Sequence, residues 1–176
     1  CLFEASINFN PIPDAEFVSR SNGDWDLSKY QAQRDLAKKS LDYDVFISVS
    51  TIWKFHQTTL VQEVSKAWEE SNHKGYMIVF GSSADTPVKG SAWMYPAEKK
   101  ALRAYCRQLS QISAGENDCK LRVTYLSPGN LHTPKQDEKL PGVNKIDCDY
   151  LAGFIQRIIE SHPDINISEV CLDRIP

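Results

Sequence analysis

Ser82, Tyr95 and Lys99 place two hydroxyl groups and one ammonium group in a short segment that follows an apolar run. Tyr95 and Lys99 are four residues apart, so on a helix they would share one face. At about 4 Å, an ammonium would lower the pKa of a phenol by roughly three units from its usual value near 10, toward proton exchange at neutral pH. Ser82 could hydrogen-bond a substrate oxygen beside that phenol. Taken alone, the Tyr-Lys pair favours a solvated helix face, so its meaning depends on the surrounding elements.

Length and composition indicate one globular domain over residues 1–176, without nucleic-acid or membrane partners. The chain is 41% hydrophobic with a formal net charge of -3, which gives no basic surface for phosphate backbones. No apolar run approaches the roughly 20 residues of a membrane span. The histidines show no ligand spacing, so no metal site is expected. The cysteines form no close pairs, which predicts reduced thiols in the cytoplasm; they are Cys1, Cys106, Cys119, Cys148 and Cys171.

Five near-continuous apolar runs predict strands that are covered on both faces, as in a parallel sheet. Amphipathic spacing between them predicts helices, and Ser28 is the expected N-cap of the first. The alternation indicates an α/β fold with helices on both faces of an open sheet. Residues 127–147 are the longest irregular stretch, and they follow a strand. Because ligands bind at the carboxyl ends of such strands, this stretch is expected to be a lid that covers the ligand-binding edge of the sheet. The expected strands are 15–20, 44–49, 76–81, 120–126 and 167–172, and the expected helices include 28–41, 53–71, 101–112 and 149–161.

The residues around this constellation match a known pattern. Ser82 ends an apolar run thirteen residues before the tyrosine of a Tyr-x-x-x-Lys motif. The next strand is followed by Pro128 and Gly129, with Thr133 four residues past the glycine. Over residues 15–176 this combination resembles the short-chain dehydrogenases/reductases. The resemblance implies a Rossmann-like, doubly wound, mostly parallel sheet.

The resemblance also implies an activity, which is hydride transfer between a nicotinamide cofactor and a carbonyl or alcohol substrate. Tyr95 would be the general acid/base. Lys99 would lower the pKa of Tyr95 and hold the nicotinamide ribose. Ser82 would orient the substrate oxygen.

A binding surface for NADP or NAD follows from the same resemblance. The segment GDWDLS looks like the family's acidic turn near the adenine, which makes Asp26 and Leu27 candidates, although Asp26 as a loop or helix-cap residue is an equal alternative. Arg20 ends the strand that faces the adenosine ribose, and its guanidinium favours NADP; a plain surface arginine is an equal alternative. Ser48 stands where relatives carry Asn-Asn-Ala-Gly. The implied contacts at the nicotinamide end are Pro128, Gly129, Thr133 and Lys99.

Two departures from the family pattern concern the cofactor side. The opening strand and the glycine-rich phosphate turn, Thr-Gly-x-x-x-Gly-x-Gly, are missing from the sequence. In one interpretation residues 1–6 are the last turn of the opening helix, and about 20 to 25 residues are absent before them. In the other, the sheet is rebuilt without the opening strand. Loss of that strand would leave strand edges unpaired and would remove the phosphate site. The family's helix asparagine should fall near residues 54–56, where Gln57 is the nearest amide.

Two functions remain open on these grounds. The first is an NAD(P)-dependent oxidoreductase with catalytic Ser82, Tyr95 and Lys99. The alternative is a non-catalytic Rossmann-like binding or scaffold domain that has lost its dinucleotide site. Relatives pair as homodimers or homotetramers through the tyrosine-bearing helix, so Trp68, Tyr105 and Leu109 belong either to such an interface or to the core. Cys106 and Cys171 are expected in the core.

Overall fold

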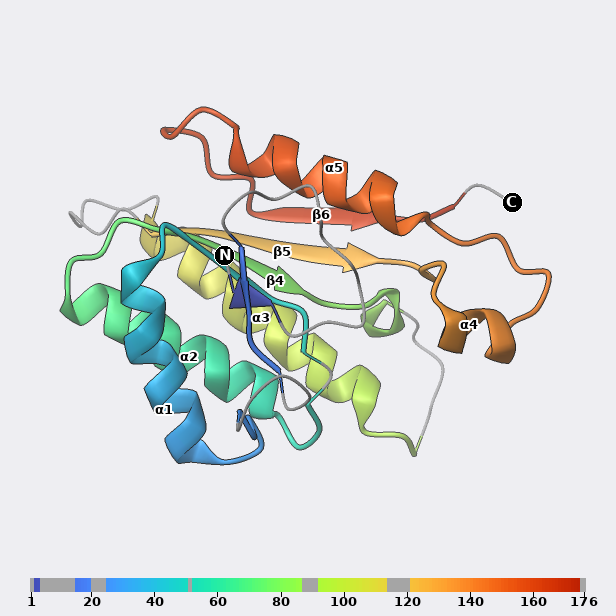
Figure 1. Cartoon of the computed structure of the whole chain (residues 1–176), viewed down its shortest axis with the longest axis horizontal. Coiled ribbons are helices and arrows are strands. Elements are labelled where there is room, and N and C mark those ends of the chain that lie inside the picture. Colours follow the sequence, from blue (N-terminus) through green and yellow to red (C-terminus); the bar gives the residue numbers. More distant parts are fainter. Residues whose placement is uncertain are drawn as a thin grey trace.

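The computed structural model describes residues 2–3, 15–19, 25–50, 52–86, 92–113 and 121–174. Six strands form one parallel sheet in the order β2-β1-β3-β4-β5-β6 (Figure 1). The chain therefore builds the sheet outward from β1 to β2 and then in the other direction from β3 to β6, as in a doubly wound fold. The strands are β1 Leu2–Phe3, β2 Glu16–Phe17, β3 Val45–Ser48, β4 Tyr76–Phe80, β5 Arg122–Pro128 and β6 Glu169–Leu172.

Helices cover both faces of the sheet, as the sequence predicts. Helices α1, α2 and α3 lie on one face and α5 lies on the other (Figure 1). Within the described residues, none of these helices has the length and apolar character needed to cross a bilayer. The helices are α1 Tyr30–Lys39, α2 His56–Glu70, α3 Tyr95–Ser113, α4 Pro134–Lys139 and α5 Cys148–Ile159, with 3-10 turns η1 Ser40–Asp42 and η2 Ser83–Asp85.

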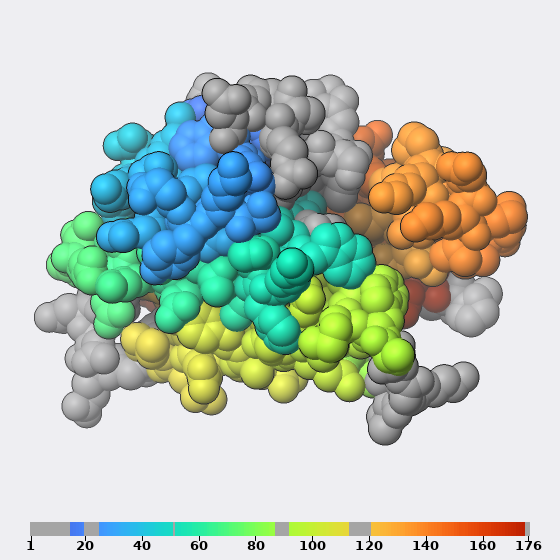
Figure 2. Space-filling view, turned by 90° about the horizontal axis from the view of Figure 1, so that it is seen from below, coloured from blue at the N-terminus to red at the C-terminus, as the bar shows by residue number. Residues whose placement is uncertain are grey.

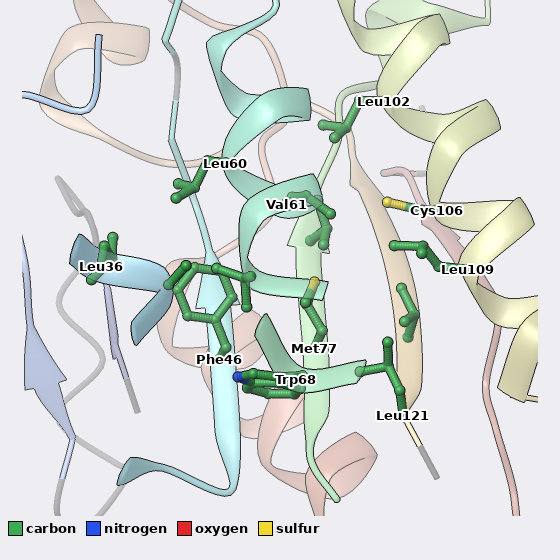
Figure 3. Packing of buried hydrophobic residues seen from close by; sticks show 14 of the residues in the cluster. Leu36, Phe46, Leu60, Val61, Trp68, Met77, Leu102, Cys106, Leu109 and Leu121 are labelled. Carbon is green, nitrogen blue, oxygen red and sulfur yellow. The ribbon is translucent and has the colours of Figure 1, made fainter. Parts of the chain in front are cut away.

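Two apolar clusters fill the space on either side of the sheet, because alternate residues of a strand point to opposite faces. Phe46 and Met77 pack under α1, α2 and α3 (Figure 3), whereas Ile47 and Ile78 pack under α5. This alternation explains why the strands are apolar almost without interruption. The parallel α/β architecture is thus confirmed.

Trp68 and Leu109 belong to the core rather than to a surface available for pairing. Trp68 is fully buried, and its indole N–H donates to Ser40 Oγ at 2.8 Å. Leu109 is 6% exposed in the same cluster, next to buried Cys106. The prediction that Cys171 is a core residue is wrong, because this thiol lies exposed on the edge strand β6.

The start of the chain differs from the sequence-based expectation. Leu2–Phe3 is a strand and not a helical turn, and it pairs in parallel with β2 and with Phe46 of β3. The expected open edge beside β3 is therefore occupied. Pairing is favoured there because an apolar central strand with unmatched N–H and C=O groups would be costly.

Two local predictions also need correction. Ser28 is not the N-cap of α1; the cap position is Lys29, which makes no side-chain capping bond. The Ser28 hydroxyl instead donates to Asp26 Oδ1 at 2.6 Å, because a carboxylate nearby is a strong competing acceptor. The segment 127–147 is partly regular, since it contains the end of β5 and helix α4.

Candidate active site

The carboxyl end of β4 carries the first of the three predicted catalytic residues. In Figure 1 the strands β4, β5 and β6 point toward the side where η2, the start of α3 and α4 lie. Ser82 follows β4 through Gly81 and caps η2, with its Oγ accepting from Ala84 N–H at 3.2 Å. A Cβ on Gly81 would stand 2.0 Å from the Tyr125 hydroxyl, so only glycine leaves room at this position.

Tyr95 begins α3, and its phenol lies near enough to the Ser82 hydroxyl for an interaction that lowers the phenol pKa. Pro96 directly after it suits the first turn of a helix, where a missing N–H costs little. One turn further on, Lys99 Nζ lies 5.6 Å from the centroid of the Tyr95 ring. The fold therefore brings the two hydroxyls and the ammonium group together, as their spacing in the sequence suggests.

Lys99 is buried, and its ammonium has two acceptors among the described residues. Nζ donates to Gln57 Oε1 at 2.5 Å and to the Phe80 carbonyl at 3.2 Å. Burial lowers the pKa of Lys99 to about 8, against the opposing charges of Glu98 and Asp85. An ammonium has three donors, so the bonds to the described residues leave one N–H that could be directed at a ligand.

Gln57 fixes this lysine from the first turn of α2. Its amide Nε2 donates to the Phe80 carbonyl at 3.0 Å and to Ser48 Oγ at 3.2 Å. Ser48 is itself 3% exposed and lies 3.3 Å from Ser50 Oγ. Ser48, predicted as a cofactor contact, therefore holds Gln57 in place through its side chain.

The pKa of Tyr95 is raised, which corrects the predicted lowering. Burial is the largest cause, the charges of Asp85 and Glu98 act in the same direction, and the hydrogen bond with Ser82 opposes them. The Lys99 ammonium is directed at Gln57 and a carbonyl instead of the phenol. Tyr95 is consequently protonated at neutral pH and is poised to donate a proton.

A buried charge network lies under these residues and was not predicted. The Tyr125 hydroxyl donates to Asp85 Oδ2 at 2.7 Å and to the Lys99 carbonyl at 3.3 Å. Arg103 bridges Asp85, at 3.2 Å, and Glu169 on β6. The network ties η2, α3, β5 and β6 to one another, and it fixes the turn of Ser82 relative to the helix of Tyr95.

The residues predicted near the adenine have structural contacts of their own. Asp26 accepts from the main-chain N–H and the hydroxyl of Ser28, which fits the alternative of a turn residue. The Leu27 side chain is 4% exposed in the core cluster, and its carbonyl accepts from Gln33 Nε2 at 2.7 Å. Arg20 lies outside the described residues.

The residues predicted at the nicotinamide end lie at the ends of β5 and α4. Pro128 is buried and pairs with Leu172. Gly129 donates its N–H to the Leu172 carbonyl at 2.7 Å, and a Cβ there would stand 2.3 Å from Asp173 Oδ1. Thr133 caps α4, with Oγ1 accepting from Gln136 N–H. Their role toward a cofactor stays a prediction.

A cleft opens beside Tyr95 and Lys99, between α3 and the turn that precedes α2. It is lined by Trp53, Phe55 and Glu98 in addition to the two catalytic candidates. The aromatic stretch IWKF, residues 52–55, and the glutamate of YPAEK are visible in the sequence. Only the fold brings them to one place.

No protein-family model matches the sequence, and comparison with curated proteins gives no match. Solved structures do match. A short-chain dehydrogenase/reductase family protein aligns with a TM-score of 0.71 at 19% identity, covering 93% of this chain and 77% of that one. A 4-hydroxyisoleucine dehydrogenase complexed with NADH gives 0.67 at 19% identity, with 89% and 79% covered.

An alcohol dehydrogenase from the archaeon Thermococcus sibiricus, complexed with 5-hydroxy-NADP, gives a TM-score of 0.62 at 19% identity, with 89% of this chain and 73% of that chain covered. These similarities define the class of fold. The chain has the Rossmann-like fold of short-chain dehydrogenase/reductase structures.

Proposed function

We propose that this chain is an NAD(P)-dependent oxidoreductase that transfers a hydride between a nicotinamide cofactor and a carbonyl or alcohol substrate. The main support is that Ser82, Tyr95 and Lys99 lie close together at the carboxyl edge of a parallel sheet. Ligands bind at this edge in such folds. Structures with this fold include dehydrogenases complexed with NADH and with an NADP analogue.

The residues present suit the nicotinamide end of such a cofactor. Among the residues that the structure describes, Lys99 bonds to Gln57 and Phe80, which leaves a third donor for which ribose hydroxyls are acceptors. A bound nicotinamide nucleotide would supply or accept the hydride. NADP is preferred over NAD in this proposal, because the guanidinium of Arg20 favours a 2′-phosphate.

In the reductive direction the chain's own groups handle the proton and the charge. Ser82 positions the carbonyl oxygen, and Tyr95, protonated at neutral pH, donates its proton to that oxygen. The charge that develops on the phenol oxygen is stabilised by the Lys99 ammonium, which Gln57 holds in place. Tyr95 is the residue that touches the reacting atom.

The test is turnover of a panel of aldehydes and ketones with NADPH or NADH. Tyr95→Phe removes only the hydroxyl and should lower kcat/KM by at least about a hundredfold, the lower range for general acid catalysis, with an unchanged circular dichroism spectrum. Turnover that is indifferent to this substitution would refute the role of Tyr95.

A second candidate is the non-catalytic Rossmann-like scaffold domain. The observation that favours it is on the adenine side, where the Leu27 side chain is buried in the core and Asp26 is engaged within its own turn. Calorimetric titration with NADH and with NADPH separates the two candidates. Binding at micromolar concentration contradicts the scaffold, whereas no binding of either nucleotide contradicts the enzyme.

A further inference from the structure

Two tryptophan rings pack against the ring of the proposed proton donor. Trp93 stacks on Tyr95 with the ring centroids 4.9 Å apart, and Trp53 meets Tyr95 edge-on at 5.9 Å. Trp53 and Trp93 are 6.2 Å apart. The hydroxyl that would touch the substrate oxygen therefore belongs to a cluster of π-systems, which prefer flat partners in stacked or edge-on arrangements.

Both tryptophan rings and the ring of Phe55 are open to solvent, and those of Trp53 and Phe55 line the cleft. Trp53 is 50% exposed, Trp93 55% and Phe55 38%. In Figure 2 the turn that precedes α2, in turquoise, lies against the start of α3, in yellow-green. Large apolar side chains gathered at one exposed place beside polar groups indicate a surface that a ligand covers.

The turn that presents two of these rings has an unfavourable backbone. Lys54 and Phe55 both have positive φ, 62° and 63°, a conformation that costs a residue with a side chain roughly 1–2 kcal/mol. Glu98 Oε1 accepts from the Lys54 main-chain N–H at 2.9 Å and so ties the turn to α3. Trp53 and Phe55 are thus held at the cleft by a strained, fixed turn instead of a mobile loop.

Charge at the cleft selects against anions. Glu98 lines it, and the negative charges of Glu98 and Asp85 both act on Tyr95. The positive charge of Lys99 is already shared with Gln57 and the Phe80 carbonyl. A substrate carboxylate or phosphate placed against these rings would be repelled by Glu98, the acidic residue that lines the cleft.

The cleft and the open space at its mouth together amount to about 270 Å³, and the enclosed part has room for about one water. A ring bound here would therefore lie in the open mouth, against the exposed side chains of Trp53 and Phe55. We propose that the substrate is an uncharged compound with its carbonyl or alcohol carbon attached to an aromatic ring, and that the ring lies against Trp53 and Phe55 while its oxygen meets Tyr95. This inference rests on the proposed function, because it names the substrate class of the same site.

The first experiment compares three ligands of similar size on the unmodified protein, in the absence of any nucleotide. Benzaldehyde is the probe, cyclohexanecarbaldehyde lacks the π-system, and 4-carboxybenzaldehyde adds an anion. Binding is followed by ligand-observed NMR. Benzaldehyde should bind roughly three- to tenfold more tightly than either control, the range that aromatic pairing supplies. Equal binding of benzaldehyde and cyclohexanecarbaldehyde would overturn the inference.

Substitutions then locate the site. Trp53→Ala should weaken benzaldehyde binding by about three- to tenfold, while Trp53→Phe, which keeps a ring, should restore most of it. Tyr150→Ala is the matched control, since Tyr150 is a 60% exposed aromatic residue on α5, on the opposite face of the sheet. Binding that Trp53→Ala leaves unchanged would place the ring elsewhere and refute the assignment.

Turnover distinguishes failure of this inference from failure of the proposed function. Benzaldehyde that binds at Trp53 but is never reduced with NADPH or NADH would refute hydride transfer and leave the aromatic site standing. Reduction of aliphatic aldehydes with no preference for aromatic ones would refute the substrate class and leave the oxidoreductase standing. Preferential reduction of benzaldehyde supports both.

Discussion

At the scale of single residues, the site depends on how Gln57 and Lys99 meet. The Gln57 carbonyl lies 2.5 Å from the Lys99 ammonium, and the Gln57 amide is held by Ser48 and the Phe80 carbonyl. Because the amide is neutral, it fixes the lysine without adding a charge that would offset burial. The lysine pKa of about 8 follows from this arrangement.

We expect carbonyl reduction to decline as the pH rises through about 8. Lys99 is charged below its pKa of about 8 and neutral above it, and only the charged form stabilises the phenolate that Tyr95 leaves behind. Gln57→Glu puts a carboxylate on the ammonium, which should raise the Lys99 pKa and move the alkaline limb of kcat/KM upward by about one unit or more.

The control for that experiment is Gln62→Glu, the same substitution at an exposed position of the same helix. It should leave the alkaline limb where it is in the unmodified protein. An alkaline limb that stays fixed in Gln57→Glu, or that moves equally in Gln62→Glu, would contradict the assignment of this limb to Lys99.

The proximity of Ser82, Tyr95 and Lys99 could be predicted from their spacing together with the family resemblance, because a strand end and one helical turn fix their neighbourhood. The direction of the Tyr95 pKa could not be predicted in the same way. It depends on burial and on the charges of Asp85 and Glu98, and on which acceptors the flexible lysine reaches after folding.

At the scale of elements, α3 is fastened to the edge strand β6 by charge pairs. Glu169 on β6 accepts from Arg103 and, at 2.8 Å, from Arg107. These bonds lower the pKa of Glu169 to about 2, and the bond with Arg103 has the largest effect. Arg103 also pairs with Asp85 in the turn that follows Ser82. The charge pairs that hold β6 therefore extend to the candidate active site.

Glu169→Gln should lower the free energy of unfolding by about 2 kcal/mol at pH 7, the scale of hydrogen bonds between charged groups. The folded-state pKa of Glu169 lies below its ordinary 4.5, so its stabilisation is full above pH 4.5 and is lost as the pH falls toward 2. Urea unfolding at pH 7 and pH 3 should show a smaller difference at the lower pH.

An exposed glutamate on α2 supplies the comparison for this experiment. Glu69→Gln should change the free energy of unfolding by less than about 0.5 kcal/mol at either pH, as surface substitutions do. If Glu169→Gln were equally mild at pH 7, the pairs that join α3 to β6 would contribute nothing measurable.

Elements with a long periodic pattern could be located from the sequence, and short ones could not. The expected strand at 76–81 and helix at 149–161 differ from β4 and α5 by one or two residues at their ends. Leu2–Phe3 has two residues and so no period to detect. The six-residue helix α4 lacks buried residues altogether, so no apolar stripe marks it in the sequence.

At the scale of the whole molecule, one sheet separates two apolar clusters. The layering could be predicted, because apolar runs need cover on both faces. The strand order could not, since pairing of β1 between β2 and β3 depends on long-range contacts with no local signature. Because the same strands contribute side chains to both clusters, we expect that neither face of the sheet is stable without the other.

Ile155→Ala, in the middle of α5, should test this coupling. Ile155 is fully buried in the cluster on the α5 face, and removal of its side chain should cost about 2–5 kcal/mol. Of the described tryptophans, Trp68 alone is fully buried, and it lies on the opposite face. Its fluorescence should nevertheless report the full destabilisation, with the same urea midpoint as circular dichroism, because a single cooperative unit loses both clusters together. Leu60→Ala on the Trp68 face is the reciprocal variant, and separate midpoints in either protein would mean that the two faces unfold independently.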